Sequence, residues 1–168
     1  MRYKSTYRSP IGDLFLLADD EGLMGLWLGK QDSRFSDDIL KDAQEKDNKA
    51  IKETRKWLDI YFTGEEPEFT PELHLEGSEF QLRVWNKLLE IPYGVTTTYG
   101  ELAKEIALEE SKEIVSAQAI GGAVGHNPIS IIVPCHRVIG SDGSLTGYGG
   151  GLGKKKKLLQ LEGAFDEI

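Results

Sequence analysis

The chain has 168 residues and carries 28 acidic against 20 basic side chains, a net charge of −8 at pH 7. This length suits one large or two small domains with a proper hydrophobic core. A single cysteine excludes an internal disulfide and is typical of a reducing compartment, so we expect a cytoplasmic protein. No apolar leader opens the sequence and no apolar run approaches membrane-spanning length, which argues against secretion and membrane insertion.

The charge is distributed unevenly. Residues 1–82 carry 11 basic and 18 acidic side chains, whereas residues 83–168 carry 9 and 10. The second part also holds four consecutive lysines, 154–157, which form either a solvated helix face or a local basic patch that meets phosphates. One cysteine and three histidines do not supply the usual ligands of structural zinc, so we expect no metal and no cofactor.

Residues 1–30 alternate and turn like a small antiparallel sheet. The strand-like stretches are 3–7, 14–18 and 23–28, and the turns between them are 9–12 and 19–22.

The charged stretch 31–49 predicts a loop or a frayed helix. A helix follows, with Ile51 and Leu58 on its apolar face, and Thr63–Gly64 ends it. Residues 65–77 hold two prolines and several acids and predict an extended linker between two domains.

The remainder of the chain predicts mainly short helices. Ser78 and Gln81 form a capping-box pattern before an apolar helix that Pro92–Gly94 interrupts. Thr98 and Glu101 repeat the pattern before a second helix.

A third helix, over 114–124, is rich in small residues. It follows the second helix across a polar turn, so the pair is a helix-turn-helix candidate. Its glycine pair would weaken an isolated helix, which suggests close approach of another backbone. A glycine-rich loop and a last amphipathic helix, ending at Glu162–Gly163, complete the chain.

The only cysteine stands in an unusual setting. The apolar run 129–133 predicts a buried strand that stops at Pro134, and Cys135 and His136 follow directly. A nucleophile at a strand end is exposed on a rigid support. The alternative is a cysteine that serves as a small buried core residue.

A Cys-His pair predicts nucleophilic chemistry if the thiol is activated. A thiol attacks as thiolate and needs a base or a positive neighbour. His136 is adjacent, but neighbouring side chains of a strand point to opposite faces, so a bridging water or a local bend is required. The base also needs an orienting carboxylate, for which Glu162 is one candidate among many.

The stretch Pro134–Val138, Pro-Cys-His-Arg-Val, resembles the signature of the O6-alkylguanine-DNA alkyltransferases. Further motifs of that family occur in the same order over about residues 78–168, namely 121–123 (Gly-Gly-Ala), 127–128 (Asn-Pro), 148–152 (Tyr-Gly-Gly-Gly-Leu) and 158–163 (Leu-Leu-x-Leu-Glu-Gly). The resemblance implies an α/β (α+β) protein of two domains. Residues 1–76 form a ribonuclease H-like lobe, a small antiparallel sheet with a helix, and residues 77–168 form a mostly helical, winged helix-turn-helix-like lobe with the active-site cysteine.

The resemblance implies a DNA-repair enzyme that acts once, on O6-alkylguanine and O4-alkylthymine in DNA. Cys135 accepts the alkyl group irreversibly. His136, which Glu162 holds in place, relays the Cys135 proton through a water. Asn127 orders the loop through hydrogen bonds. Tyr99 matches the tyrosine that turns the phosphate of the target nucleotide and helps protonate the departing guanine.

The resemblance also implies a monomer that binds double-stranded DNA with an alkylated guanine through the minor groove, with the target base flipped out. The residues expected to contact DNA or the base are Ser116, Ala117, Gln118, Gly121, Gly122, Arg137, Val138, Tyr148, Gly149 and Lys155. Two departures stand out. Gln118 replaces the arginine that relatives often insert into the base stack, and the segment 106–113 is longer and more acidic than in many of them.

Two other function classes compete with this reading. A non-catalytic damage-binding helix-turn-helix protein needs no nucleophile, and Cys135 in its motif speaks against it. A Cys-His hydrolase or acyl transferase needs an oxyanion hole and many turnovers. Single residues also have ordinary interpretations: Tyr99 as a packing residue, Asn127 as a turn residue and Arg137 as one half of a structural ion pair.

Overall fold

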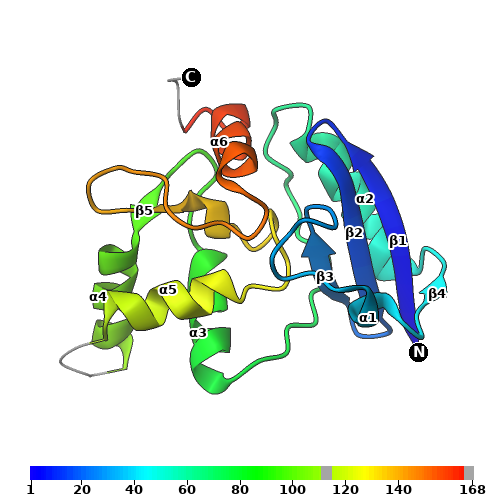
Figure 1. Cartoon of the computed structure of the whole chain (residues 1–168), viewed down its shortest axis with the longest axis horizontal. Coiled ribbons are helices and arrows are strands. Elements are labelled where there is room, and N and C mark those ends of the chain that lie inside the picture. Colours follow the sequence, from blue (N-terminus) through cyan, green and yellow to red (C-terminus); the bar gives the residue numbers. More distant parts are fainter. Residues whose placement is uncertain (111–114, 165–168) are drawn as a thin grey trace. The chain divides into compact units, whose positions relative to one another are not determined.

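The computed structural model describes residues 1–110 and 115–164. The chain divides into two compact units, Met1–Glu76 with Pro128–Ser130, and Gly77–Asn127 with Ile131–Ile168 (Figure 1). Within the described ranges, no helix combines the length and the apolar character needed to cross a membrane.

The first unit is a four-stranded sheet in the order β3-β2-β1-β4, with β1, β2 and β3 antiparallel and β4 parallel to β1. Its elements are β1 (Arg2–Ser9), β2 (Gly12–Asp19), β3 (Leu23–Trp27), α1 (Asp37–Leu40), β4 (Gln44–Glu45) and α2 (Lys49–Tyr61). The three antiparallel strands and the long helix confirm the expected sheet-plus-helix lobe. The short α1 and β4 occupy the stretch predicted as a loop or frayed helix.

Helix α2 covers one face of this sheet (Figure 1). The helix begins after Asn48, whose side chain accepts a hydrogen bond from the backbone N–H of Ile51 at 3.1 Å. Ile51 and Leu58 on its apolar face are fully buried, as are Leu14 and Leu16 of β2. The apolar periodicity of α2 and of the strands therefore builds the core of this unit.

Residues 128–130 belong to the first unit although they are distant from it in sequence. The backbone of Leu26 in β3 receives a hydrogen bond from Ser130 N at 3.1 Å and donates one to Pro128 O at 2.9 Å. Arg34, ion-paired with Asp32 at 2.8 Å, donates from Nη2 to Ser130 Oγ at 2.5 Å. Residues 128–130 are thus held within the first unit by backbone and side-chain hydrogen bonds.

The second unit is mostly helical, with one two-stranded parallel sheet of β5 and β6. Its elements are α3 (Glu79–Leu88), β5 (Thr97–Thr98), α4 (Tyr99–Glu109), α5 (Ala117–Gly125), a 3₁₀ helix (Cys135–Arg137), β6 (Val138–Ile139) and α6 (Leu152–Leu161). The capping box predicted at Ser78 and Gln81 is present with both of its hydrogen bonds. The buried Trp85 of α3 donates from Nε1 to the carbonyl of Ala123 at 2.8 Å and so ties α3 to α5.

Helices α4 and α5 form the predicted pair of short helices. Thr98 and Ser116 cap them through side-chain oxygens that accept from Glu101 N and Ala119 N. Helix α5 begins later than the predicted 114–124, because Ser116 is its N-cap. In the segment 106–113, residues 106–109 belong to α4 and Glu110 is its C-cap, and the rest of the expected turn lies outside the described residues.

The predicted strand over 129–133 is wrong. This stretch is a buried turn with one isolated bridge, at Ile129. The backbone of Ile131 is left-handed, with φ of 72°, a conformation that β-branched residues rarely adopt. The apolar composition correctly indicated burial. An apolar run can be buried in a turn as well as in a strand, provided that its backbone groups are hydrogen-bonded.

Candidate active site

Cys135 is the first residue of the 3₁₀ helix Cys135–Arg137, and only 3% of its surface is exposed. Its backbone N–H donates to the carbonyl of Val133 at 2.8 Å. Neighbouring side chains on a 3₁₀ helix are separated by about 120°, compared with about 180° on a strand. The objection that Cys135 and His136 face opposite ways therefore does not apply.

The backbone before Cys135 is held by Asn127. This side chain is fully buried and donates from Nδ2 to the carbonyl of Val133 at 2.8 Å. Between them lies the left-handed Ile131, a conformation that costs roughly 1–3 kcal/mol and persists only where its surroundings enforce it. The structure thus brings Asn127 to the loop whose order the resemblance assigns to it.

The buried side chains of His136, Arg137 and Glu162 are hydrogen-bonded to one another. The carboxylate of Glu162, at the end of α6, accepts from His136 Nε2 at 2.7 Å and from Arg137 Nε and Nη2 at 2.8 and 3.0 Å. The backbone N–H of Gly94 also donates to it, at 3.3 Å. The carboxylate that the sequence left as one candidate among many is the one that contacts the histidine.

Burial and this pairing shift both pKa values downward. Desolvation lowers the pKa of His136, aided by the charges of Arg137 and Lys155 and opposed by Glu162. For Glu162, burial alone would raise the pKa, but the hydrogen bonds and charges of His136 and Arg137 hold it well below its usual value. At neutral pH the site therefore contains a neutral imidazole beside an ionised carboxylate.

The second ring nitrogen of His136 is available for chemistry. Nδ1 is buried and has no hydrogen-bond partner among residues 1–110 and 115–164. With Nε2 donating to Glu162, the neutral ring presents Nδ1 as an acceptor. A base oriented by a carboxylate through its other nitrogen is the arrangement that activates nucleophiles in catalytic triads.

Two residues expected to contact DNA or the base play a different part. Arg137 is buried, bonded to Glu162 and, through Nη1, to the carbonyl of Ile91 at 2.7 Å. Lys155 is fully buried, and its ammonium donates to the carbonyls of Val138 and Thr146. Both charged groups are bonded to groups of the protein, which argues against a direct contact with a phosphate. For Arg137 the structural ion pair is the interpretation that holds.

Among the other residues expected to contact DNA or the base, those from 116 to 122 lie on α5 or at its N-cap, and Tyr148 and Gly149 lie in the glycine-rich loop. Ser116, Ala117, Gln118 and Gly122 are exposed on α5. A Cβ at Gly122 would meet nothing within 4 Å, and one at Gly121 would reach the ring of Tyr99 at 3.9 Å. Tyr99, half-buried at the start of α4, therefore lies against α5 at its glycine pair.

The expected base-reading groups come from three places. Val138 is buried in β6, directly after the cysteine turn. Tyr148 and Gly149 lie half-buried in the loop between β6 and α6. Sequence reasoning missed the backbone groups of Gly94 and Ile91 that hold Glu162 and Arg137; the only available signal was the turn predicted at Pro92–Gly94.

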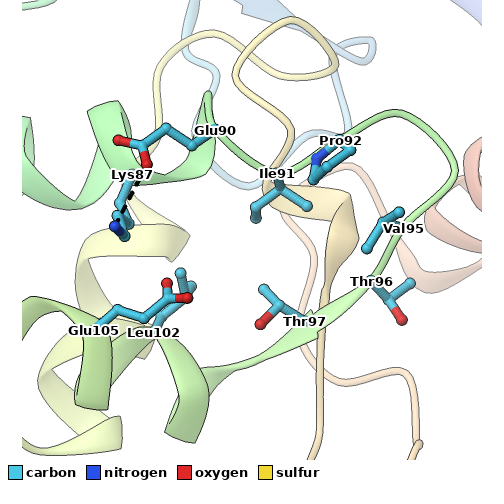
Figure 2. Close-up of a pocket in the computed structure, with 9 residues that line it drawn as sticks. All are labelled: Lys87, Glu90, Ile91, Pro92, Val95, Thr96, Thr97, Leu102 and Glu105. Atoms are coloured by element: carbon cyan, nitrogen blue, oxygen red, sulfur yellow. Dashed lines mark hydrogen bonds and ion pairs between the residues drawn. The ribbon is translucent and has the colours of Figure 1, made fainter.

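A cavity of about 250 Å³ lies between the end of α3, the chain that leads into β5, and α4 (Figure 2). Ile91 and Leu102 form apolar parts of its wall, and Lys87, ion-paired with Glu90 at 3.4 Å, lies at one side (Figure 2). Cys135 does not line it, so it is not the site where the nucleophile meets its substrate.

One cluster in the described ranges has side chains close enough to hold a metal ion: Asp19, Glu21 and His74 of the first unit. His74 Nδ1 already pairs with Asp19 Oδ2 at 2.7 Å. This cluster does not contain the cysteine, and exposed acidic groups of this kind are common without an ion. The absence of a metal stays a prediction.

Comparison with known proteins covers both units. The DNA-binding domain of 6-O-methylguanine DNA methyltransferase matches residues 79–164, and the ribonuclease-like domain of the same family matches residues 2–75. A methylated-DNA–protein-cysteine methyltransferase of Methanosarcina acetivorans is 44% identical over 164 residues, 96% of this chain and 99% of the relative. One of Mycolicibacterium paratuberculosis is 47% identical over 157 residues, 94% of this chain and 90% of the relative.

Solved structures agree. Mycobacterium tuberculosis O6-methylguanine methyltransferase has a TM-score of 0.84 at 44% identity, over 98% of this chain and 94% of that one. Mycobacterium tuberculosis OGT in complex with DNA has a TM-score of 0.82 at 45% identity, over 96% and 93%. Fold and cysteine site thus define a protein in which a ribonuclease-like domain precedes a DNA-binding domain.

The chain belongs to the 6-O-methylguanine DNA methyltransferase family. Membership confirms the resemblance, the fold class and the expectation of a DNA-repair enzyme that transfers a methyl group from methylated DNA to a protein cysteine.

Proposed function

We propose that the protein repairs O6-alkylguanine in double-stranded DNA by moving the alkyl carbon to Cys135 Sγ, once per molecule, and that O4-alkylthymine is a second substrate. The observation that carries this proposal is the buried His136, which is oriented by Glu162 at 2.7 Å and keeps Nδ1 for a proton. The same pair on a hydrolase would act many times, because an acyl-enzyme is cleaved by water whereas a thioether is not.

The reaction exchanges one bond for another. The Cys135 proton passes through a water to His136 Nδ1, and the thiolate attacks the alkyl carbon in line with its bond to O6. The S–C bond forms as the C–O6 bond breaks, and the guanine leaves with the bonding pair. Tyr99 supplies a proton to the departing base, and the thioether is permanent, so the protein inactivates itself.

The DNA-binding surface is assigned to α4 and α5, with the minor groove as its target. Exposed small residues on α5 let a nucleic acid backbone come close, and Gly122 has open space around it. Gln118 would fill the gap left by the flipped base. The backbones of Val138 and Gly149, with Tyr148 over the pocket, would then read the guanine edge.

The chemistry of the thiol also bears on the cellular compartment of the protein. A free catalytic thiol needs a reducing compartment, so we place the protein in the cytoplasm, acting as a monomer on chromosomal DNA. The similar Mycobacterium tuberculosis protein has been solved in complex with DNA, which supports DNA as the partner.

The direct test is the intact mass of the protein after mixing with a duplex that contains O6-methylguanine. The wild type should gain one methyl group per chain. Cys135→Ser should gain none while it keeps its DNA affinity, because an alcohol is a far weaker nucleophile than a thiolate and binding uses other groups. Uptake by the serine variant would refute the assignment. No uptake by the wild type would favour a damage-binding protein, and multiple turnover would favour a hydrolase.

A further inference from the structure

The turn between α3 and β5 is built around a glycine. The backbone N–H of Val95 donates to the carbonyl of Pro92 at 3.1 Å and closes a four-residue turn, in which Gly94 is the third residue. Gly94 has φ of 79°, and a positive φ at the third position is characteristic of a type II turn, which takes glycine or asparagine there. The turn itself therefore needs the conformation of Gly94 but would also accept asparagine.

The backbone at this turn contacts both members of the buried ion pair beside His136. The carbonyl of Ile91, just before the turn, accepts from Arg137 Nη1 at 2.7 Å. The N–H of Gly94 donates to Glu162 Oε1 at 3.3 Å, and Glu162 Oε2 accepts from His136 Nε2 at 2.7 Å. One carboxylate thus has the glycine on one oxygen and the histidine on the other.

Gly94 also comes close to the backbone of Glu162. A Cβ at position 94 would lie 3.1 Å from the carbonyl oxygen of Glu162, which is tighter than side-chain carbons normally approach. Any side chain would therefore have to push residue 162 away by a few tenths of an ångström. The turn alone would accept asparagine, but this contact favours a residue without a side chain.

The orientation of His136 depends on the Glu162 carboxylate. The ring is fully buried, and its contact through Nε2 determines which ring nitrogen carries the proton. A hydrogen bond weakens steeply when its distance or angle departs from the preferred values. Since a positioned general base contributes about 100- to 10,000-fold to a rate, a small displacement of Glu162 should remove a measurable share of the transfer rate.

We propose that Gly94 is a positioning residue for alkyl transfer: its bare α-carbon and its N–H set the place of the Glu162 carboxylate, and through it the orientation of the His136 base. The inference rests on the proposed function. It gives the turn between α3 and β5, 68 residues before Glu162 in the sequence, a part in the reaction.

The test compares alanine and asparagine at Gly94 with the same two residues at Gly64, which follows α2 in the first unit and has φ of 90°. Alanine resists a positive φ and adds a Cβ, whereas asparagine tolerates this conformation and adds the same Cβ. The single-turnover rate of methyl transfer from an O6-methylguanine duplex should fall about tenfold in both Gly94→Ala and Gly94→Asn. Gly64→Ala and Gly64→Asn should match the wild type.

A pH–rate profile separates positioning from a general loss of stability. Burial lowers the pKa of His136, the charges of Arg137 and Lys155 add to this effect, and Glu162 opposes it. If Glu162 moves away in the Gly94 variants, the pKa of His136 falls further, so the acid limb of the profile should shift to lower pH. A variant that is only less stable keeps the wild-type profile at temperatures where it is folded.

Each other outcome overturns the inference. Rates within threefold of the wild type in both Gly94 variants mean that the position tolerates a side chain, and a normal rate in Gly94→Asn alone means that only the turn conformation matters. A slower rate with an unchanged pH profile means that Gly94 supports the fold and not the base. If neither Gly94 variant folds, hydrogen exchange of the wild type decides: the Gly94 amide should be protected, and exchange as fast as in an unprotected amide would refute the contact. A wild type without transfer would instead refute the proposed function.

Discussion

Replacing Glu162 with glutamine tests the centre of the site. The carboxylate accepts hydrogen bonds from His136, Arg137 and Gly94 and is almost fully buried. Glutamine has nearly the same shape but no charge, so the Arg137 guanidinium loses its counter-ion in a buried place. Removing one partner of a buried ion pair costs about 3–5 kcal/mol. Because the amide oxygen still accepts one hydrogen bond, we expect a loss near 3 kcal/mol.

Thermal unfolding measures this loss. For a chain of this size 1 kcal/mol changes Tm by about 2–4 °C, so Glu162→Gln should lower Tm by roughly 6–12 °C. The control is Glu105→Gln, an exposed acid on α4, which should leave Tm within about 1 °C.

The same substitution should slow methyl transfer by about 100-fold, the scale of general-base catalysis. Glu162 fixes the His136 tautomer that leaves Nδ1 free and stabilises the imidazolium that forms when the thiol gives up its proton. The assay is the single-turnover rate on O6-methylguanine duplex. A variant with the lower Tm but a transfer rate within threefold of the wild type would refute the catalytic reasoning and leave Glu162 as a structural residue.

The pH dependence of stability adds an independent check. Both His136 and Glu162 have lowered pKa values in the folded state, so the unfolded chain binds more protons and stability rises with pH. The contribution of Glu162 is complete above its ordinary pKa of 4.5 and is lost as pH falls through the folded value. That of neutral His136 is complete above 6.5 and declines below it. Glu162→Gln should therefore flatten the stability profile below about pH 5 while the histidine part remains.

Two further predictions concern DNA. Gln118→Ala should slow transfer from duplex DNA at least tenfold more than transfer from free O6-benzylguanine, because only in the duplex does the flipped base leave a gap to fill. Equal effects on both substrates would mean that Gln118 does not fill this gap. Since Arg137 and Lys155 are buried, we expect DNA binding to neutralise about two to four phosphates. A fluorescence-anisotropy titration with undamaged duplex should then give an affinity on the order of micromolar and a log–log salt slope of about −1.8 to −3.6, at roughly −0.9 per phosphate. A slope steeper than about −6 would mean an extensive basic surface.

The arrangement of charges also refines how the thiol is activated. A Cys-His site can rest as a thiolate paired with an imidazolium, or as a thiol beside a neutral base. Here burial and the Arg137 charge both lower the pKa of His136, and Arg137 shares the Glu162 carboxylate with it. These effects favour the neutral form of the His136 imidazole.

Much of the local structure is readable from the sequence because it depends on near neighbours. The Ser78–Gln81 capping box and the Thr98 cap need only residues three positions apart. The apolar face of α2 and the first strands can be predicted from the periodic spacing of apolar residues alone. The cysteine motif is likewise continuous, so the family and its reaction follow from Pro134–Val138 and the motifs around it.

The tertiary structure decided what depends on distant partners. A run of branched apolar residues is equally compatible with a strand and with a buried turn, and the hydrogen bond from Asn127 to the carbonyl of Val133 spans the turn around Ile131. The sequence does not distinguish the four consecutive lysines. In the folded chain, the carbonyls of Val138 and Thr146 accept hydrogen bonds from one of them, Lys155. Glu162 was one acid among 28; only folding brings it to within 2.7 Å of the histidine. Long-range burial and hydrogen bonding, which no local pattern encodes, made these choices.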